Sequence, residues 1–171
     1  MTLYHASIES YKIGHVIGPY QKTRFSKNTI PAKALEYRER YLEDGRPDGE
    51  RSRCSSVFAF ARAEQCVAFM LAENRGDFEV YKITTNDCDD CDGHPMALVE
   101  HLLDDDNSTS NKVIVSEYWT PKGKWNYLEF LCREATVTEI MPKEFGRDVM
   151  TRSLERISYG NDSSQAKTIV A

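Results

Sequence analysis

The sequence predicts a mixed α+β domain, with helices concentrated in the first two-thirds of the chain and adjacent antiparallel strands in the last third. Three observations lead to this prediction. Amphipathic helical patterns occupy 32–44 and 63–71. Short apolar and aromatic runs typical of strands occur near both ends of the chain. A turn containing Pro and Gly, at 121–124, separates two of the late runs, as in a hairpin.

Residues 1–77 are predicted to contain two strands and two helices. Leu3–Ser7 is a short apolar-aromatic run, which indicates an opening strand. The segment Ala32–Asp44 is predicted to be helical and to end in the turn-rich loop 45–49. Its apolar residues fall near one helical face: Ala34, Leu35, Tyr41 and Leu42. A compact strand at Ser56–Phe60 then runs directly into an amphipathic helix at Ala63–Leu71.

From Phe78 onward, the predicted elements are mostly strands. Phe78–Thr84 alternates apolar and polar side chains, as a half-buried strand does. A short helix is expected at Met96–Leu103. The runs Val113–Trp119 and Tyr127–Cys132 are rich in β-branched and aromatic residues, so we expect two strands that form a hairpin around the turn 121–124.

The chain ends with a predicted strand at Ala135–Met141, a modest helix at Pro142–Ile157 and a polar tail. With 171 residues, one domain over 1–157 and a loosely held tail over 158–171 is the expected organisation. Three internal stretches are predicted as loops: 13–19, 86–93 and 104–111.

Charge and cysteine content limit the function classes. Lys and Arg number 22 against 27 Asp and Glu, a net charge of -5, so the chain has no general attraction to nucleic acid or to anionic membranes. A nucleic-acid partner is not excluded, but it needs a local basic patch. No apolar run is long enough for a membrane-spanning helix and no signal peptide is visible, so a cytoplasmic location is expected. The five cysteines are therefore expected to be free thiols.

The cysteines and histidines of the acidic loop form a possible metal site. Cys88 and Cys91 have the local spacing of zinc ligands, and His94 and His101 follow them. No second Cys-x-x-Cys pair exists, however, and a helix at 96–103 directs His101 away from the loop. The same loop fails as a calcium site, because its first and last ligand positions are not carboxylates. A solvated acidic turn without metal is the favoured interpretation, and a structural zinc site is the alternative.

Three short segments carry the functional hypothesis: Leu3-Tyr4-His5-Ala6-Ser7, Val57-Phe58-Ala59-Phe60-Ala61 and Tyr127-Leu128-Glu129-Phe130-Leu131. In this order they resemble the ADP-ribosyltransferase superfamily. Its core supplies a His followed two residues later by Ser or Thr, then an aromatic or small residue from a strand that enters a helix, and later a Glu. The resemblance spans roughly residues 3–141. It implies an ADP-ribosyltransferase-like split antiparallel β core with flanking helices.

The shorter stretches that resemble one branch of this superfamily, small phage and bacterial proteins, are 12–17, 36–38, 52–53 and 118–119. The resemblance implies an NAD-dependent mono-ADP-ribosyltransferase, an enzyme of the glycosyltransferase class. Its expected target is a macromolecule, with protein favoured, and its expected setting is that of a phage or bacterial effector.

The resemblance assigns the catalytic roles to Glu129 and His5. Cleavage of the nicotinamide–ribose bond develops positive charge on the ribose, and a carboxylate such as Glu129 near the 2′-hydroxyl stabilises that charge. A neutral imidazole, His5, can hydrogen-bond a ribose hydroxyl, and Ser7 adds a hydroxyl nearby. Strand periodicity places His5 and Ser7 on one face of their strand.

The remaining NAD contacts are expected from an arginine and two phenylalanines. Phe58 or Phe60 can stack on the cationic nicotinamide ring, and strand periodicity cannot choose between them because they share a face. Arg53 can pair with the pyrophosphate through two parallel hydrogen bonds.

Each of these residues also has a purely structural interpretation when it is taken alone. Taken alone, each is more often structural: a strand histidine, two core phenylalanines, a solvated strand glutamate and a surface arginine. Only their ordered combination favours the transferase. Glu117 and Glu134 compete with Glu129 as the catalytic carboxylate, with Glu117 second. Tyr127 stands where arginine-modifying members of the superfamily carry Glu or Gln, which weakens arginine as the acceptor. A non-catalytic module that binds a protein or a nucleotide on the same fold is the alternative function.

Overall fold

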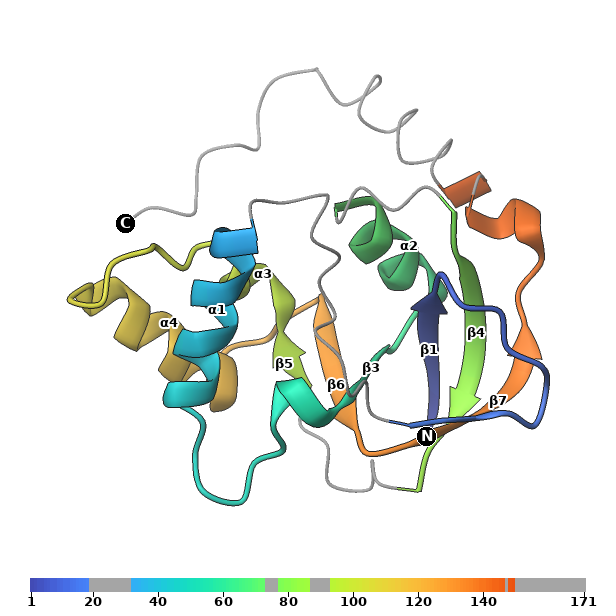
Figure 1. The fold of residues 1–171 in the computed structure, drawn as a ribbon, viewed down its shortest axis with the longest axis horizontal. Coiled ribbons are helices and arrows are strands. Elements are labelled where there is room, and N and C mark those ends of the chain that lie inside the picture. Colours follow the sequence, from blue (N-terminus) through green and yellow to red (C-terminus); the bar gives the residue numbers. More distant parts are fainter. Residues whose placement is uncertain (19–31, 73–76, 87–92, 147, 150–171) are drawn as a thin grey trace.

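A computed structural model describes residues 1–18, 32–72, 77–86, 93–146 and 148–149. These residues form an antiparallel seven-stranded sheet with flanking helices (Figure 1). The strands are β1 (Thr2–Ser7), β2 (Val16–Ile17), β3 (Val57–Phe60), β4 (Glu79–Thr84), β5 (His94–Pro95), β6 (Leu128–Cys132) and β7 (Ala135–Ile140). The helices are α1 (Ala32–Asp44), the 3-10 turn η1 (Arg53–Ser55), α2 (Ala63–Ala72), α3 (Met96–Val99) and α4 (Thr109–Trp119). The predicted α+β class is confirmed.

The sheet has the strand order β2-β7-β4-β1-β3-β6-β5. Its shortest strand pairing is the one between β1 and β3. Strands β1 and β4 pair from Thr2↔Thr84 to Ser7↔Glu79, whereas β1 and β3 pair only at Tyr4↔Phe60. Beyond this pair, His5 spans the two strands, and its Nδ1–H donates to the carbonyl of Phe58 at 2.7 Å. The sheet therefore consists of two well-paired parts joined at one narrow contact.

The helices divide between these two parts of the sheet (Figure 1). Helices α1, α3 and α4 lie together beside β5 and β6, while α2 lies beside β1 and β4. Trp119 on α4 ties the helical layer together, because its indole N–H donates to the carbonyl of Leu42 on α1 at 2.7 Å. The resulting core beneath α1 and α4 is made of Leu42, Phe58, Val99, Leu102, Val115, Tyr118, Trp119 and Leu131.

The prediction of a strand at Val113–Trp119 is wrong, because this segment is the second half of α4. The Ser108 hydroxyl caps the helix by accepting from the Asn111 N–H at 3.2 Å. The Asn111 side chain in turn binds both backbone groups of Leu103, at 3.0 and 2.8 Å. Val115, Tyr118 and Trp119 then share one buried face at helical spacing. Capping and tertiary packing outweigh the β-propensity of Val113-Ile114-Val115.

The predicted hairpin is consequently wrong as well. Strand β6 pairs with β3 on one side, from Val57↔Cys132 to Phe60↔Glu129, and with the short β5 on the other. Strand β5 was not predicted. This exchange of partners places Glu129 in the interior of the sheet, with Phe60 and His94 opposite it on the two neighbouring strands.

Several element boundaries also differ from those predicted. The helix expected at Met96–Leu103 is confined to α3, and part of the loop expected at 13–19 forms β2, which pairs with β7. Of the helix predicted at Pro142–Ile157, residues 143–146 and 148–149 are helical. The tail predicted at 158–171 lies outside the described residues. Within the described ranges, no helix combines the length and apolar character needed to cross a membrane.

Candidate functional site

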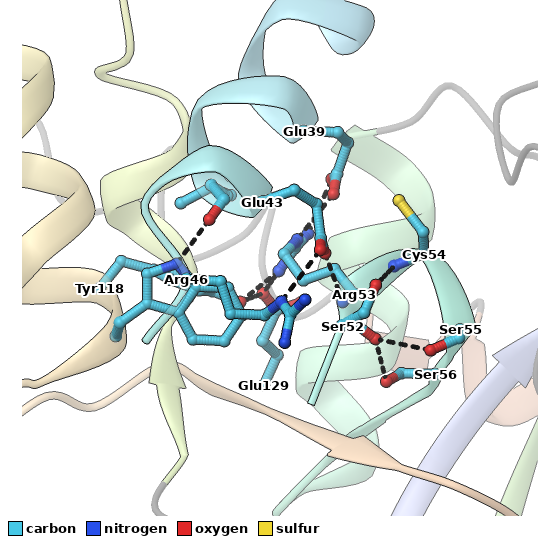
Figure 2. Close-up of polar contacts among 12 residues, drawn as sticks. Glu39, Glu43, Arg46, Ser52, Arg53, Cys54, Ser55, Ser56, Tyr118 and Glu129 are labelled. Carbon is cyan, nitrogen blue, oxygen red and sulfur yellow. Dashed lines mark hydrogen bonds and ion pairs between the residues drawn. The ribbon is translucent and has the colours of Figure 1, made fainter. Parts of the chain in front are cut away.

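The candidate site is a buried ion-pair cluster centred on Arg53 (Figure 2). The Arg53 guanidinium pairs with the carboxylate of Glu129 on β6 through Nη1. The side chain of Arg53 is 2% exposed and that of Glu129 is 0% exposed. Arg53 and Glu129 are 76 positions apart in the chain, so the fold, not local sequence, brings them together.

The local structure before β3 directs Arg53 inward. Ser52 caps η1, with its hydroxyl accepting from the Cys54 N–H at 3.2 Å. The Ser56 hydroxyl donates to the Ser52 carbonyl at 2.6 Å and closes the turn. Because η1 ends directly before β3, the Arg53 side chain lies over the buried face of that strand, with its guanidinium carbon 4.8 Å from the centre of the Phe58 ring.

Helix α1 supplies two acidic partners for Arg53, and both reach down toward it in Figure 2. Glu39 accepts from Nε at 2.8 Å and from Nη2 at 2.9 Å, a two-point ion pair. Glu43, one helical turn further on, accepts from the Arg53 backbone N–H at 2.6 Å and from Nε of Arg46 at 3.1 Å. Sequence analysis did not identify Glu39 or Glu43 as site residues.

The hydroxyl of Tyr118 completes the cluster. It accepts from Nη1 of Arg53 and donates to Oε1 of Glu129, the latter at 2.5 Å. The Tyr118 ring is stacked on the imidazole of His94 at a centroid distance of 5.0 Å, and Nδ1–H of His94 donates to the Tyr118 carbonyl at 3.1 Å. The last turn of α4 and strand β5 thus fix the Tyr118 hydroxyl over Glu129.

Charge in this cluster is not evenly balanced. Burial acts to lower the pKa of Arg53, but Glu39 and Tyr118 outweigh it, so that pKa lies above its ordinary value. One guanidinium faces two carboxylates, Glu39 and Glu129. The second oxygen of Glu129, Oε2, is buried and has no hydrogen-bond partner. A buried carboxylate oxygen of this kind can accept one more hydrogen bond, and leaving it unsatisfied is unfavourable.

The structure brings three of the sequence-predicted site residues into contact: Arg53, Phe58 and Glu129. Phe60 lies beside them, directly opposite Glu129 in the pairing of β3 with β6, and it packs on Tyr127 at a centroid distance of 5.7 Å. Phe58 and Phe60 are 2% and 1% exposed, so both are core residues in this conformation.

His5 and Ser7 are not brought to this cluster. Residues paired directly across antiparallel strands project from the same face of a sheet, so Tyr4, Phe60 and Glu129 share one face. His5, adjacent to Tyr4, projects from the opposite face. There it packs near Tyr11 at a centroid distance of 6.5 Å, and the Ser7 hydroxyl accepts from the Glu9 N–H at 2.9 Å. Glu129 and His5 are therefore separated by strand β3.

The competing carboxylates lie outside the cluster. Glu117 is on α4, and its carboxylate accepts from the N–H groups of Lys122 and Gly123. These hydrogen bonds, led by that of Lys122, lower the pKa of Glu117. Glu134 is exposed in the turn between β6 and β7. Of these three glutamates, Glu129 alone is buried beside a cation.

The zinc alternative is tested only in part by the structure. Cys88 and Cys91 lie outside the described residues. His94 is buried against Tyr118 and Trp119, while His101 is exposed. Cys54, Cys66 and Cys132 are free thiols, as expected. In the described part of the chain, no three His, Cys, Asp or Glu side chains are grouped so as to hold a metal ion.

Comparison with known proteins leaves this geometry as the basis for a functional assignment. No protein-family model matches the chain, and no curated protein matches it.

The signal that could have revealed the cluster was present in the sequence but incomplete. Glu39 and Glu43 are four residues apart, so they share one face of a helix. Such a face is usually solvated, and nothing in the sequence shows that this one turns toward Arg53. The strand predicted at 113–119 gives Tyr118 the wrong backbone, so the contact of its hydroxyl with Glu129 could not be derived from the pattern.

Proposed function

We propose that the chain is an NAD-dependent mono-ADP-ribosyltransferase that modifies a macromolecular target, with Glu129 as the catalytic carboxylate. The observation that carries the proposal is the buried Oε2 of Glu129, an acceptor without a partner, beside an arginine able to bind phosphate. The ordered sequence segments that contain His5, Phe58 and Glu129 add support through their resemblance to the superfamily.

The chemistry requires a buried carboxylate. In the reaction, the bond between C1′ of the ribose and the nicotinamide nitrogen breaks, a bond from C1′ to the acceptor forms, and the acceptor loses a proton. Positive charge develops on the ribose, and a carboxylate held in a water-poor environment stabilises it strongly. Oε2 of Glu129 is suited to accept a hydrogen bond from a ribose hydroxyl, and Phe58 supplies an aromatic face nearby.

The conformation described here is a closed one under this proposal. Glu129 is 0% exposed, so NAD reaches it only after side chains that cover it rearrange. His5 then acts from the narrow contact between β1 and β3 and not from the Glu129 face. The ADP-ribosyltransferase-like split core remains part of the proposal, with the β1–β3 boundary as the candidate position of the split.

The direct experiment measures nicotinamide release from NAD and transfer of labelled ADP-ribose to proteins of a bacterial lysate. The Glu129→Gln variant is expected to lose about 10²–10³-fold in rate, the range seen when one group that stabilises transition-state charge is removed. Glu117→Gln is the matched control, because it removes a carboxylate that lies outside the cluster, and its rate should equal that of the wild type. Absence of nicotinamide release from the wild-type chain would contradict the proposal.

A non-catalytic module that binds a nucleotide or a protein is the second candidate. The complete burial of Glu129 and the position of His5 on the other face favour it. NAD binding without nicotinamide release, detected as a rise in thermal stability, would support this function over the enzymatic one. Ligand at 100 times its dissociation constant adds about 2.7 kcal/mol of stability.

The setting of the proposed activity follows from the same argument. A protein target is favoured because the net charge of -5 opposes general binding to nucleic acid. A cytoplasmic location and a role as a phage or bacterial effector belong to the proposal.

A further inference from the structure

The ion-pair cluster has three layers between solvent and sheet. The Glu39 side chain, 15% exposed, is the outer layer. The Arg53 guanidinium, 2% exposed, lies beneath it, and the Glu129 carboxylate, 0% exposed, is the innermost. Figure 2 shows the same succession, from Glu39 on α1 through Arg53 to Glu129. A ligand that approaches Arg53 from solvent therefore meets Glu39 first.

Glu39 occupies the edge of the guanidinium best suited to an anion. The Nε and Nη2 atoms of Arg53 each donate to a different oxygen of Glu39, at 2.8 and 2.9 Å. A phosphate group accepts the same pair of parallel hydrogen bonds from arginine. The Glu39 carboxylate thus holds the position on Arg53 that a phosphate oxygen pair would take.

We propose that Glu39 is an internal competitor at Arg53, displaced when a pyrophosphate-containing ligand, such as a nucleoside diphosphate, pairs with the same edge of the guanidinium. This inference rests on the proposed function, since it identifies how the pyrophosphate of NAD enters the closed site. It also specifies which contact breaks: the pair between Glu39 and Arg53, not the pair between Arg53 and Glu129.

The contacts of the two carboxylates explain why Glu39 is the one displaced. Glu129 is fully buried, belongs to the central sheet and also accepts from the Tyr118 hydroxyl. Glu39 is on the surface side and belongs to a helix. Turning its side chain toward solvent replaces one anion on the guanidinium by another, so Arg53 remains paired throughout.

Glu43 keeps the arginine in place during this exchange. It accepts from the Arg53 backbone N–H, not from the guanidinium, and it is paired with Arg46. Loss of the Glu39 contact therefore leaves η1 anchored to α1.

The expected signature is an increase in affinity on removal of a native ion pair. Only molecules in which Glu39 has left the guanidinium edge of Arg53 are competent to bind. The apparent dissociation constant is therefore the intrinsic one divided by the fraction of such molecules, which makes it larger. A purely structural role for Glu39 predicts the opposite, since weakening the cluster would disorder the site and reduce binding.

The experiment titrates inorganic pyrophosphate, and separately ADP, into wild-type, Glu39→Gln and Asp44→Asn proteins by calorimetry. Glu39→Gln is expected to bind both probes about tenfold more tightly than wild type, because a larger fraction of its molecules is competent to bind. Asp44→Asn, which removes one negative charge at the exposed end of α1 and outside the cluster, should bind within about twofold of wild type. Glu39→Asp is measured in parallel and should also bind more tightly, because its shorter side chain reaches Nε and Nη2 of Arg53 less well. If Glu39→Gln does not fold, the result for Glu39→Asp decides the test.

Binding of both probes that is unchanged or weaker in the Glu39 variants overturns the inference, as does a complete absence of binding in wild type and variants alike. An equal gain in Asp44→Asn overturns it too, because the gain would then be a general charge effect. The titration requires no turnover. Tighter binding by Glu39→Gln without nicotinamide release supports the anion site while rejecting the enzymatic function, and turnover without tighter binding gives the reverse result.

Discussion

Arg53 and Glu129 form an ion pair in which the two side chains are 2% and 0% exposed. Removing two charges from water is costly, and the pair is maintained only because further polar contacts surround it. Glu39 and Tyr118 provide those contacts. The pair also joins the turn before β3 to the centre of β6, so it connects the helical layer to the sheet.

The first prediction concerns the unequal roles of the two partners. Arg53→Met leaves Glu39 and Glu129 without their cation and should lower the free energy of unfolding by about 3–5 kcal/mol. Glu129→Gln leaves the pair of Arg53 with Glu39 intact and should cost only about 1–2 kcal/mol. Urea unfolding of both variants measures the difference. Equal losses would mean that Glu39 does not support Arg53 independently.

The second prediction concerns the close approach of α1 to α4. A Cβ atom added at Gly45 would lie 2.3 Å from Cγ1 of Val115, far inside the contact distance. Gly45→Ala should therefore destabilise the protein by about 1–3 kcal/mol through overpacking. Gly18→Ala is the control, because no atom lies within 4 Å of its added Cβ. A thermal melt of Gly45→Ala that matches that of the control would show that the helices separate freely.

The third prediction concerns stability at alkaline pH. Burial raises the pKa of the Cys66 thiol well above its ordinary value of 9.0. A raised folded pKa means that the thiol stays neutral in the folded chain while it ionises in the unfolded chain. The stabilising contribution is complete below pH 9 and is lost as pH rises above it, by up to about 1.4 kcal/mol per pH unit.

Urea unfolding between pH 8 and about 10.5 measures this loss, because the thiol of the unfolded chain ionises near pH 9. The Cys66→Ala variant should be less stable at neutral pH, because it loses a buried side chain, but its stability should fall less steeply above pH 9. Parallel curves for wild type and variant would exclude Cys66 as the source of the alkaline loss.

The fourth prediction concerns His5. Replacing it by Phe removes the 2.7 Å hydrogen bond to the Phe58 carbonyl and should cost about 1–2 kcal/mol. Amide exchange should quicken at β1 and β3 and remain unchanged at β4 and β7, which are paired along their length. His101→Ala serves as the control because His101 is exposed. Uniformly faster exchange throughout the sheet would indicate global destabilisation instead.

Much of the fold could be predicted where local pattern and tertiary packing agree. The helix expected at 32–44 has the bounds of α1, and the predicted strands at 3–7, 78–84 and 127–132 differ from β1, β4 and β6 by a residue at most. The failure at 113–119 has a physical origin. β-branched residues favour strands only weakly, and the Ser108 cap and the packing of Trp119 on α1 supply more free energy than that preference.

For the candidate site, the sequence predicted several of the residues better than it predicted their arrangement in space. Arg53, Phe58 and Glu129 were identified from the sequence and do lie together. The direct pairing of Arg53 with Glu129 could not be predicted, because it depends on the turn at Ser52 and on which strand pairs with β6. The separation of His5 from Glu129 likewise follows from strand order, which puts β3 between them, and from the pleat, which turns adjacent residues to opposite faces.

Strands β1 and β3 pair only at Tyr4 and Phe60, so the sheet has a weak boundary between two parts that are each paired more fully. All members of the Arg53 cluster lie on the side of this boundary that contains β3, β5, β6, the turn η1 and the helices α1 and α4. Ser7 and Tyr81 make hydrogen bonds to the Glu9 backbone on the other side. When thermal motion opens the fold locally, without full unfolding, the two parts of the sheet should therefore separate at this boundary. The charges would stay buried on their own side, while the hydrogen bond from His5 to the Phe58 carbonyl would be among the contacts that break.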